Sequence, residues 1–404
     1  MKRVIYKIII LVALSFCFLL GGCTDALYSC TEVGQGLEAL SSIEAYGDYT
    51  FQQGSTYIYK NEKFSIASVL AGKRAEYGMK KGSQSEGTYI VEKDDYIYTL
   101  YRFGRYTKDD VSYRDVLIAR APRANPRDLK VVVALKKVTG REPYIYILGD
   151  YLVFCSNNIY VYDTQTFNRV KQYSIDYFAG DEAWTEGEYF AICDYNGNGK
   201  GYTYTILDED LNEYKFNNTY ELRRIDLYKD YFIVKESEVY NFKTNELLDA
   251  ETASLIYQEN EKRNEAISAE RQMFTYNGAK YSWHAEDTQN PENMDETNGN
   301  SYYTYYPDLV ITNLQTGERH VFLQEEFSKQ ASEIINALGT MIYCEDILSE
   351  NGELYFVYAY HTPDFQKGDT PGVFFKYDEQ SGKLLYIGSA YYSYLTHVYR
   401  GKIF

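Results

Sequence analysis

Gly149-Asp150-Tyr151-Leu152-Val153 is one of seven versions of a short unit in which a turn leads directly into an apolar strand. In the five closest versions a tyrosine stands two positions after the first turn residue, and hydrophobic residues continue the strand. Gly-Asp and Asn-Gly pairs favour the positive φ angles that a tight hairpin needs, so each unit predicts a hairpin. The other six units begin at Gly47, Asp94, Gly187, Lys229, Asn277 and Asn351.

A second hairpin follows these units, and its turn is again rich in Asp and Asn. Together the two hairpins make a repeat of four strands, A to D, joined by an A–B turn, a B–C connection and a C–D turn. From Tyr151 to Tyr189 is 38 residues and from Tyr189 to Tyr231 is 42, a period typical of repeated β-sheet units. The C–D turns lie at residues 163–166, 208–210, 241–245, 313–317 and 378–382.

Repeats of this length and strand number resemble the blades of β-propellers, where an Asp/Asn-x-x-Ser/Thr-Gly-Lys/Arg turn commonly precedes the last strand. The resemblance implies an all-β chain: a single β-propeller of about seven four-stranded blades, with six or eight as alternatives. In the strand after Asp150, Leu152 and Phe154 point to one face and Val153 and Cys155 to the other, so both faces are apolar, as in a sheet with a neighbour on each side. An open β-sandwich or two smaller domains are the competing interpretations.

The last nine residues, Thr396 to Phe404, resemble one more strand A with its turn. We expect this strand to pair with the first blade, which would close the ring and remove an exposed sheet edge.

The long connections all fall between strands B and C or between D and A, which places them on one face of the predicted ring. That face is either a binding surface or the place where insertions are best tolerated. We expect short helical insertions there, because residues 251–272 lack Gly and Pro and because five apolar residues share a helical face before Gly339. The five are Phe327, Ala331, Ile334, Ile335 and Leu338, and the long connections are 102–114, 194–201, 285–302, 361–371, 68–86, 250–271 and 324–339.

The N-terminus carries a second informative pattern, Leu20-Gly21-Gly22-Cys23, at the end of an apolar run that follows Lys2 and Arg3. It resembles the lipobox of bacterial lipoproteins, which implies a signal peptide over residues 1–22, diacylglycerol on the Cys23 thiol and cleavage just before it. Residues 23–40 would be the lipidated cysteine and a short tether, and residues 41–404 the propeller. An ordinary secretory signal or an uncleaved anchor is the alternative.

The lipobox implies an extracytoplasmic protein that is lipid-anchored to the cell membrane, with the membrane itself as one partner. A composition rich in lysine, tyrosine and asparagine favours the surface of a Gram-positive bacterium over a periplasm. Removal of residues 1–22 takes away three cations and no anion, which lowers the net charge from −17 to −20. Such a charge disfavours nucleic acid and other polyanions as partners of the domain as a whole, although a local basic patch could override this.

Residues that could carry chemistry are few. Asp194, Asn196 and Asn198 resemble the first half of a calcium loop, but Thr205 stands where the closing carboxylate would be, so a plain hairpin loop competes with Ca²⁺ as the only cofactor considered. The acidic Glu286, Asp287 and Asp295 could collect cations or simply be solvated. Four loop tyrosines could stack on a sugar or on a partner protein, or pack within the blades: Tyr302, Tyr303, Tyr305 and Tyr306.

The cysteines argue against a disulfide framework. Cys155 and Cys193 each lie four residues past the strand-B tyrosine of successive blades, so they should be about 10 Å apart. A disulfide needs Cα atoms within about 7 Å, and we therefore expect both thiols to be free and packed in the sheets.

No pattern in the chain identifies a substrate. The Ser-x-Asp-x-Gly-x-Thr-Trp boxes of sialidase-type propellers and the per-blade tryptophans of quinoprotein propellers are missing, since Trp184 and Trp283 are the only two tryptophans. We favour a binding or scaffolding lipoprotein without catalytic residues, whose loop-rich face takes a partner protein or an envelope polymer. The alternatives are a glycosidase or lyase with paired carboxylates, and a solute-binding or sensor subunit.

Overall fold

Six of the seven predicted units form hairpins, and the strand that follows each of the seven units' turn residues is the second strand of a sheet. In the unit that begins at Gly47 this strand pairs instead with the last strand of the chain, residues 397–400. These strands begin within one residue of the predicted positions, and each carries at least one buried side chain. They are β2 (Tyr49–Gln53), β6 (Tyr96–Arg102), β11 (Tyr151–Cys155), β15 (Tyr189–Tyr195), β19 (Tyr231–Lys235), β23 (Ala279–Glu286) and β27 (Glu353–His361).

The computed structural model describes residues 44–45, 48–60, 62–83, 86–140, 142–175, 182–197, 201–218, 226–270, 272–286, 308–322, 341–350, 352–361, 372–378, 383–390 and 395–404. In these ranges the remaining strands are β1 (Glu44–Ala45), β3 (Thr56–Tyr59), β4 (Glu62–Ser65), β5 (Gly87–Lys93), β7 (Tyr106–Lys108), β8 (Val111–Pro122), β9 (Lys130–Val138), β10 (Tyr144–Leu148), β12 (Asn158–Asp163), β13 (Arg169–Ser174), β14 (Glu182–Glu186), β16 (Tyr202–Leu207), β17 (Glu213–Asn218), β18 (Asp226–Tyr228), β20 (Glu238–Asn241), β21 (Glu246–Leu247), β22 (Met273–Tyr276), β24 (Asp308–Asn313), β25 (Arg319–Phe322), β26 (Met341–Glu350), β28 (Gly372–Asp378), β29 (Lys383–Ala390) and β30 (His397–Arg400).

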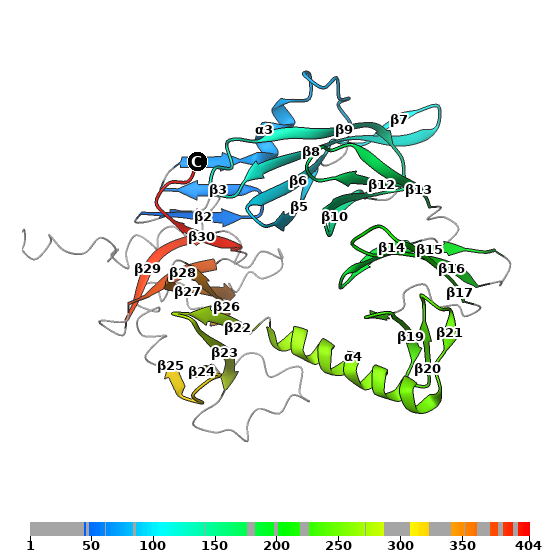
Figure 1. Ribbon diagram of the computed structural model, residues 1–404. Coiled ribbons are helices and arrows are strands. Elements are labelled where there is room, and N and C mark those ends of the chain that lie inside the picture. The colour runs from blue at the N-terminus through cyan, green and yellow to red at the C-terminus, as the bar shows by residue number, and fades with distance from the viewer. Residues whose placement is uncertain are drawn as a thin grey trace, which may run out of the picture. The chain divides into compact units, whose positions relative to one another are not determined.

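The described strands form seven antiparallel sheets, each built on four strands in the order A, B, C, D (Figure 1). This is the strand arrangement of a seven-bladed β-propeller, and it confirms the predicted all-β fold class and the blade number. Two sheets carry an extra strand: β1 pairs with β29, and β7 pairs with the first residues of β8. The sheets are β30-β2-β3-β4, β5-β6-β8-β9, β10-β11-β12-β13, β14-β15-β16-β17, β18-β19-β20-β21, β22-β23-β24-β25 and β26-β27-β28-β29.

The chain divides into two compact units, which are described separately below. The first comprises residues 1–53, 57–63 and 270–402, and the second comprises residues 54–56, 64–269 and 403–404. The second unit holds the four consecutive sheets from β5 to β21 and the site discussed below.

The A–B turns are tight for the reason that the sequence suggested. Their first residue has a positive φ in each of five blades, whether or not that residue is glycine. Gly149 at 49° and Gly187 at 59° adopt this conformation at little cost, whereas Asp94 and Lys229, both at 52°, adopt it despite a Cβ atom. Asn277 at 48°, followed by Gly278 at 78°, is the fifth turn.

The C–D turns repeat one hydrogen-bonded structure. In three of them the first side-chain oxygen accepts two backbone N–H groups, and the backbone N–H four residues later donates to the first carbonyl. The first residue is Asp163, Asn241 or Asn313, which explains why Asp and Asn recur there. These hydrogen bonds hold the pKa of the exposed Asp163 carboxyl below its usual value.

The C-terminal strand pairs with the first hairpin, as predicted. β30 lies antiparallel to β2, with Tyr49 opposite Arg400 and Gln52 opposite His397. The backbone N–H of Gly401 donates to Asp48 O at 2.7 Å, and the Thr50 hydroxyl donates to Gly401 O at 2.6 Å. Residues from opposite ends of the sequence therefore complete one sheet, in which β2 has a hydrogen-bonded neighbour on each side.

The described residues include two helices, α3 (Ile66–Gly72) and α4 (Ala250–Glu270), both in D–A connections. Ser65 caps α3, and the Asp249 carboxylate caps α4 by accepting the N–H groups of Glu251 and Thr252 at 3.1 and 3.0 Å. Ala253 on α4 is buried against Ile233 and Val239. The helix expected over 251–272 is thus confirmed, whereas the one expected around 327–338 lies outside the described residues.

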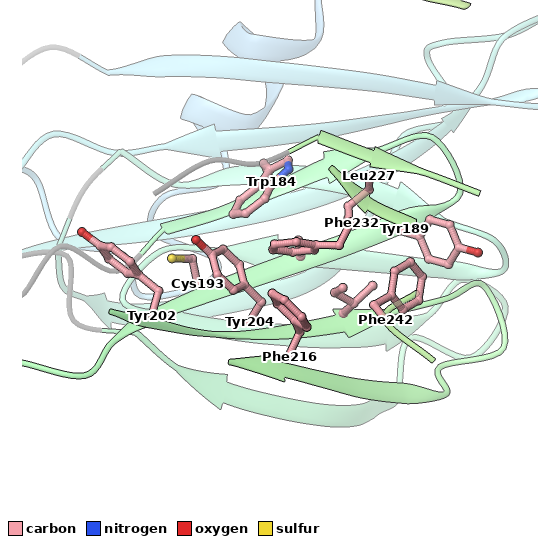
Figure 2. Packing of buried hydrophobic residues seen from close by; sticks show 11 residues of the cluster. Trp184, Tyr189, Cys193, Tyr202, Tyr204, Phe216, Leu227, Phe232 and Phe242 are labelled. Carbon is pink, nitrogen blue, oxygen red and sulfur yellow. The ribbon is translucent and has the colours of Figure 1, made fainter. Parts of the chain in front are cut away.

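Aromatic side chains fill the space between consecutive sheets of the second unit, as Figure 2 shows for the strands from β14 to β20. Phe232 has no solvent exposure, and its ring centroid lies 4.7 Å from that of Tyr204 and 4.4 Å from that of Phe216. Such packing on both faces of a sheet explains the uninterrupted apolar strands.

None of the helices in the described part of the chain has the length and apolarity needed to cross a membrane.

Candidate functional site

Three arginines gather around one carboxylate at the loop end of the second unit, and we call Arg102, Arg105, Arg114 and Glu142 the arginine cluster. Arg102 ends strand B of its blade, Arg105 follows it in the B–C connection, and Arg114 lies near the start of strand C. Glu142 precedes strand A of the next blade. The cluster therefore joins two neighbouring blades.

The strand register explains why two of these arginines meet. Arg102 lies opposite Val116, and Arg114 lies two residues before Val116, so both side chains share one face of the sheet. The apolar residues of that face pack against the next blade, and the two guanidinium groups cover the end of this packing. Gly87 lies opposite Arg102, and a Cβ atom on Gly87 would come within 2.7 Å of the Arg102 side chain. A glycine at this position thus makes room for the guanidinium.

Glu142 bonds to Arg114 with both of its oxygens. The two Arg114–Glu142 hydrogen bonds are each 2.7 Å long, and a terminal nitrogen of Arg102 also donates to Oε2 of Glu142. Arg105 is held more loosely: its Nη2 lies 3.6 Å from Oε1 of Glu142 and donates to Gly140 O at 3.3 Å. The Arg114 side chain is only 7% exposed, against 30% for Arg105 and 35% for Glu142. Arg114 is thus the buried anchor and Arg105 the accessible member.

Burial lowers the pKa of Arg114, Glu142 raises it, and the neighbouring Arg105 and Arg102 lower it further. The net direction is downward, yet a guanidinium group remains charged at neutral pH. Among the described residues, three positive charges therefore face one negative charge, in a chain whose net charge is −17.

The hydrogen bonds that Asp115 accepts hold the B–C connection in place behind the cluster. Asp115 is 1% exposed and points to the other face of the sheet, where it accepts the Lys80 and Lys137 backbone N–H groups at 2.7 and 2.9 Å. It also accepts the Tyr106 hydroxyl at 2.8 Å, and burial together with this bond raises the pKa of Tyr106 to about 12. Asp115 thereby fixes three segments around the cluster.

A cavity of about 390 Å³ lies beside the cluster. In the part of the chain that the structure describes, its wall combines one arginine, two carboxylates and two tyrosines with smaller residues. Tyr144 is 40% exposed and packs edge-on against Tyr89, with ring centroids 5.5 Å apart, while Tyr146 packs against Phe190. The lining residues are Arg105, Glu142, Tyr144, Tyr146, Cys155, Glu182 and Ala183.

A smaller cavity of about 200 Å³ lies in the first unit, between the sheets that contain β23 and β27. It borders an A–B turn and a C–D turn, at the opposite end of the blades from the long connections. The residues of its wall that the structure describes are mostly apolar and include no arginine: Phe274, Tyr276, Tyr281, Ile311, Asn313, Glu318, His320, Leu354 and Tyr377.

The structure places few of the residues that the sequence singled out. Glu286 is the last residue of β23, with its backbone opposite Asp308. The remaining acidic and tyrosine candidates, and the lipidation site, lie outside the described residues: Asp287, Asp295, Tyr302, Tyr303, Tyr305, Tyr306 and Cys23.

The calcium-like stretch begins inside a strand rather than in a loop. Asp194 belongs to β15 and lies opposite Thr203, and the side-chain oxygen of Asn196 accepts the Thr203 hydroxyl at 3.0 Å. Asn198 lies outside the described residues. In the described part of the chain no three His, Cys, Asp or Glu residues are grouped as a metal site would need, and calcium binding here stays a prediction.

Cys155 and Cys193 form no disulfide and are buried in different packing layers, as expected. Cys155 also lines the larger cavity.

The sequence interpretation missed the arginine cluster, although one signal was present. Residues 102–114 were recognised as a long B–C connection, and three arginines fall within those thirteen positions of an acidic chain. Nothing in the sequence indicated that Glu142 lies beside these arginines, because its position depends on how consecutive blades pack.

Comparisons with known proteins give no relative by sequence: no family model matches the chain, and none of the curated proteins does. Among solved structures, the dihydro-heme d1 dehydrogenase NirN is similar over 80% of this chain and 77% of its own, with 9% identity and a TM-score of 0.28. The β-propeller domain of the Trilobed protease from Pyrococcus furiosus is similar over 75% and 83%, with 12% identity and a TM-score of 0.26. An α-L-arabinofuranosidase from Clostridium thermocellum is similar over 78% and 99%, with 10% identity and a TM-score of 0.22. Similarities this weak carry no information about activity, and the propeller fold rests on the strand pairing of the chain itself.

Proposed function

We propose that the protein is an extracytoplasmic lipoprotein, anchored to the cell membrane through Cys23, whose propeller binds a partner or an envelope ligand. The anchor is supported by the lipobox Leu20-Gly21-Gly22-Cys23. The binding role is supported by one observation above all, the cavity of about 390 Å³ beside the arginine cluster. This volume lies within the range of small-molecule sites, about 300–1,000 Å³.

The position of the cavity agrees with binding at the face that carries the long connections. Cys155 ends a strand B, and Glu182 begins a strand A, so both lie at the loop end of their blades. The arginine cluster is also the kind of local basic patch that can attract an anionic ligand to an otherwise acidic chain.

A carbohydrate-active enzyme is the second candidate, because Glu142 and Glu182 both line the cavity. A glycosidase needs one carboxylic acid that gives a proton to the leaving group. Both oxygens of Glu142 accept guanidinium N–H groups, so this side chain is poorly suited to deliver a proton. We therefore rank binding ahead of hydrolysis. A solute-binding or sensor subunit would use the same cavity, and the identity of the captured molecule separates these roles.

Capture from the native envelope tests the binding role. The lipidated chain, purified in detergent and immobilised, is incubated with solubilised envelope from its source cells. Arg105→Gln should lower recovery of the captured component at least tenfold. The matched control is Arg169→Gln, which removes the same charge from an exposed strand-D residue beside a C–D turn. Equal recovery with both variants, after each is confirmed to be folded, would contradict the assignment of the cavity.

Labelling with a fatty acid tests the anchor separately. Cys23→Ala should leave an unprocessed precursor that incorporates no label, since the thiol is the acceptor. Normal labelling of this variant would refute the lipoprotein assignment.

A further inference from the structure

We infer that the cavity beside the arginine cluster binds a sugar ring that carries a single carboxylate, such as a hexuronate. This rests on the proposed function, because it names the ligand class of the same site. Three features of the wall select this chemistry, and they come from three different blades or connections.

The first feature is the spare donor capacity of Arg105. Three guanidinium groups carry about fifteen N–H donors, and one carboxylate offers about four acceptor positions. Glu142 is already bonded to Arg114 and Arg102, and its distance of 3.6 Å to Arg105 is too long for a hydrogen bond. Among the described residues, Gly140 O is the acceptor within reach of Arg105, at 3.3 Å. Arg105 is therefore placed to bind a second carboxylate with its planar fork.

The second feature is the aromatic part of the wall. Tyr144 and Tyr146 are two residues apart on β10, so their side chains lie on the same face of the sheet. The faces of aromatic rings are electron-rich, which suits the weakly positive C–H groups of a sugar ring. Tyr144 is held edge-on by Tyr89, so its orientation is set before a ligand arrives. A simple carboxylate such as acetate would not use this surface.

The third feature is Glu182, which lines the same cavity as Arg105 and carries the opposite charge. A carboxylate accepts hydrogen bonds from hydroxyl groups and repels a second negative charge. With Glu142 and Glu182 both in the wall, the site should reject a phosphate dianion. The combination of one cation, two aromatic rings and a hydroxyl acceptor fits a hydroxylated ring with one negative charge.

Titration calorimetry with defined sugars tests this inference on the full mature chain. Galacturonate and glucuronate are the probes, and galactose, glucose, acetate and glucose 6-phosphate are the comparison compounds. We expect at least one uronate to bind ten times more tightly than its neutral sugar and than acetate, with an affinity that falls as salt is raised. The phosphorylated sugar should bind more weakly than the uronate.

Variants locate the binding. Arg105→Gln should lower uronate affinity at least tenfold and leave the weak binding of the neutral sugar unchanged. Tyr144→Ala should weaken the uronate and the neutral sugar by the same factor, whereas Tyr276→Ala, in the smaller cavity of the other unit, should change neither. Glu182→Gln should narrow the difference between the uronate and the phosphorylated sugar.

Two results would overturn the inference. Equal affinity for uronate, neutral sugar and acetate would show that the wall does not select sugars with a carboxylate. Tighter binding of an acidic peptide than of any uronate would show the same. If capture from the envelope still depended on Arg105 in that case, the binding function would stand and the ligand class alone would be wrong. If neither capture nor uronate binding depended on Arg105, both proposals would fail.

Discussion

Replacing Glu142 by glutamine should destabilise the second unit through its effect on Arg114. The substitution keeps the shape and one acceptor oxygen but removes the charge that faces three guanidinium groups. Losing one partner of a fully buried ion pair costs about 3–5 kcal/mol, and an exposed pair contributes about 0.2–1 kcal/mol. Arg114 is 7% exposed and Glu142 is 35% exposed, so the pair lies between these limits. We expect a loss of about 2–3 kcal/mol in the free energy of unfolding.

Urea unfolding followed by tryptophan fluorescence measures this loss in the right unit. Trp184, which is 6% exposed, belongs to the same unit as Glu142, whereas Trp283 belongs to the other. A Trp283→Phe background therefore leaves a single reporter. With a urea dependence of about 2 kcal/mol per molar, the midpoint should fall by about 1–1.5 M.

Two controls separate charge from shape. Arg114→Met, added to Glu142→Gln, removes the uncompensated buried cation and should recover most of the lost stability. Raising the salt from about 0.1 M to about 1 M should also narrow the deficit of the single variant, because repulsion among the remaining guanidinium groups is screened. A midpoint shift below about 0.3 M, or a double variant less stable than the single one, would refute the reasoning.

Four further predictions concern the fold. Deleting residues 395–404 removes β30 and the buried Val398 from the sheet of β2, and should cause aggregation or a large fall in melting temperature; an equally stable truncation would refute this. Phe232→Ala should cost about 3–5 kcal/mol in urea unfolding because the ring is fully buried between Tyr204 and Phe216, and Phe232→Leu should cost clearly less. Burial raises the pKa of Asp346 in the folded chain. The stability that the neutral carboxyl group contributes to the fold is therefore present at low pH and is lost as pH rises through the raised pKa. Asp346→Asn should stabilise the fold at pH 7 and not at about pH 3, as melting curves at the two pH values would show. Burial also raises the pKa of Asp208, but the hydrogen bonds from Asn212 and Tyr214 outweigh burial, and the net direction of the pKa is downward. Asp208→Asn should therefore lower the stability of the fold at pH 7, and this loss should vanish as pH falls. A loss of stability that is constant with pH would contradict this.

The amino-acid sequence by itself determined the repeated part of this protein. The period of about forty residues and the turn chemistry were sufficient to locate all seven strands B, because a two-residue hairpin imposes positive φ on its first residue and Gly, Asp and Asn adopt it most easily. The same local logic located α4 and the pairing of β30 with β2. The burial of Cys155 and Cys193 without a disulfide followed from their position in the repeat.

Only the tertiary structure decided where chemistry could occur. Arg102 and Arg114 are brought onto one face by the register of β6 and β8, while Glu142 comes from the next blade and meets them across a packed interface. Glu182, forty residues further along the chain, completes the cavity wall from a third blade. Two smaller domains were one interpretation of the sequence, but no pattern in a sequence that repeats throughout marks the boundaries of the two compact units. Turn and strand propensities depend on neighbours within a few residues, whereas these contacts depend on how separate sheets pack, which no local pattern encodes.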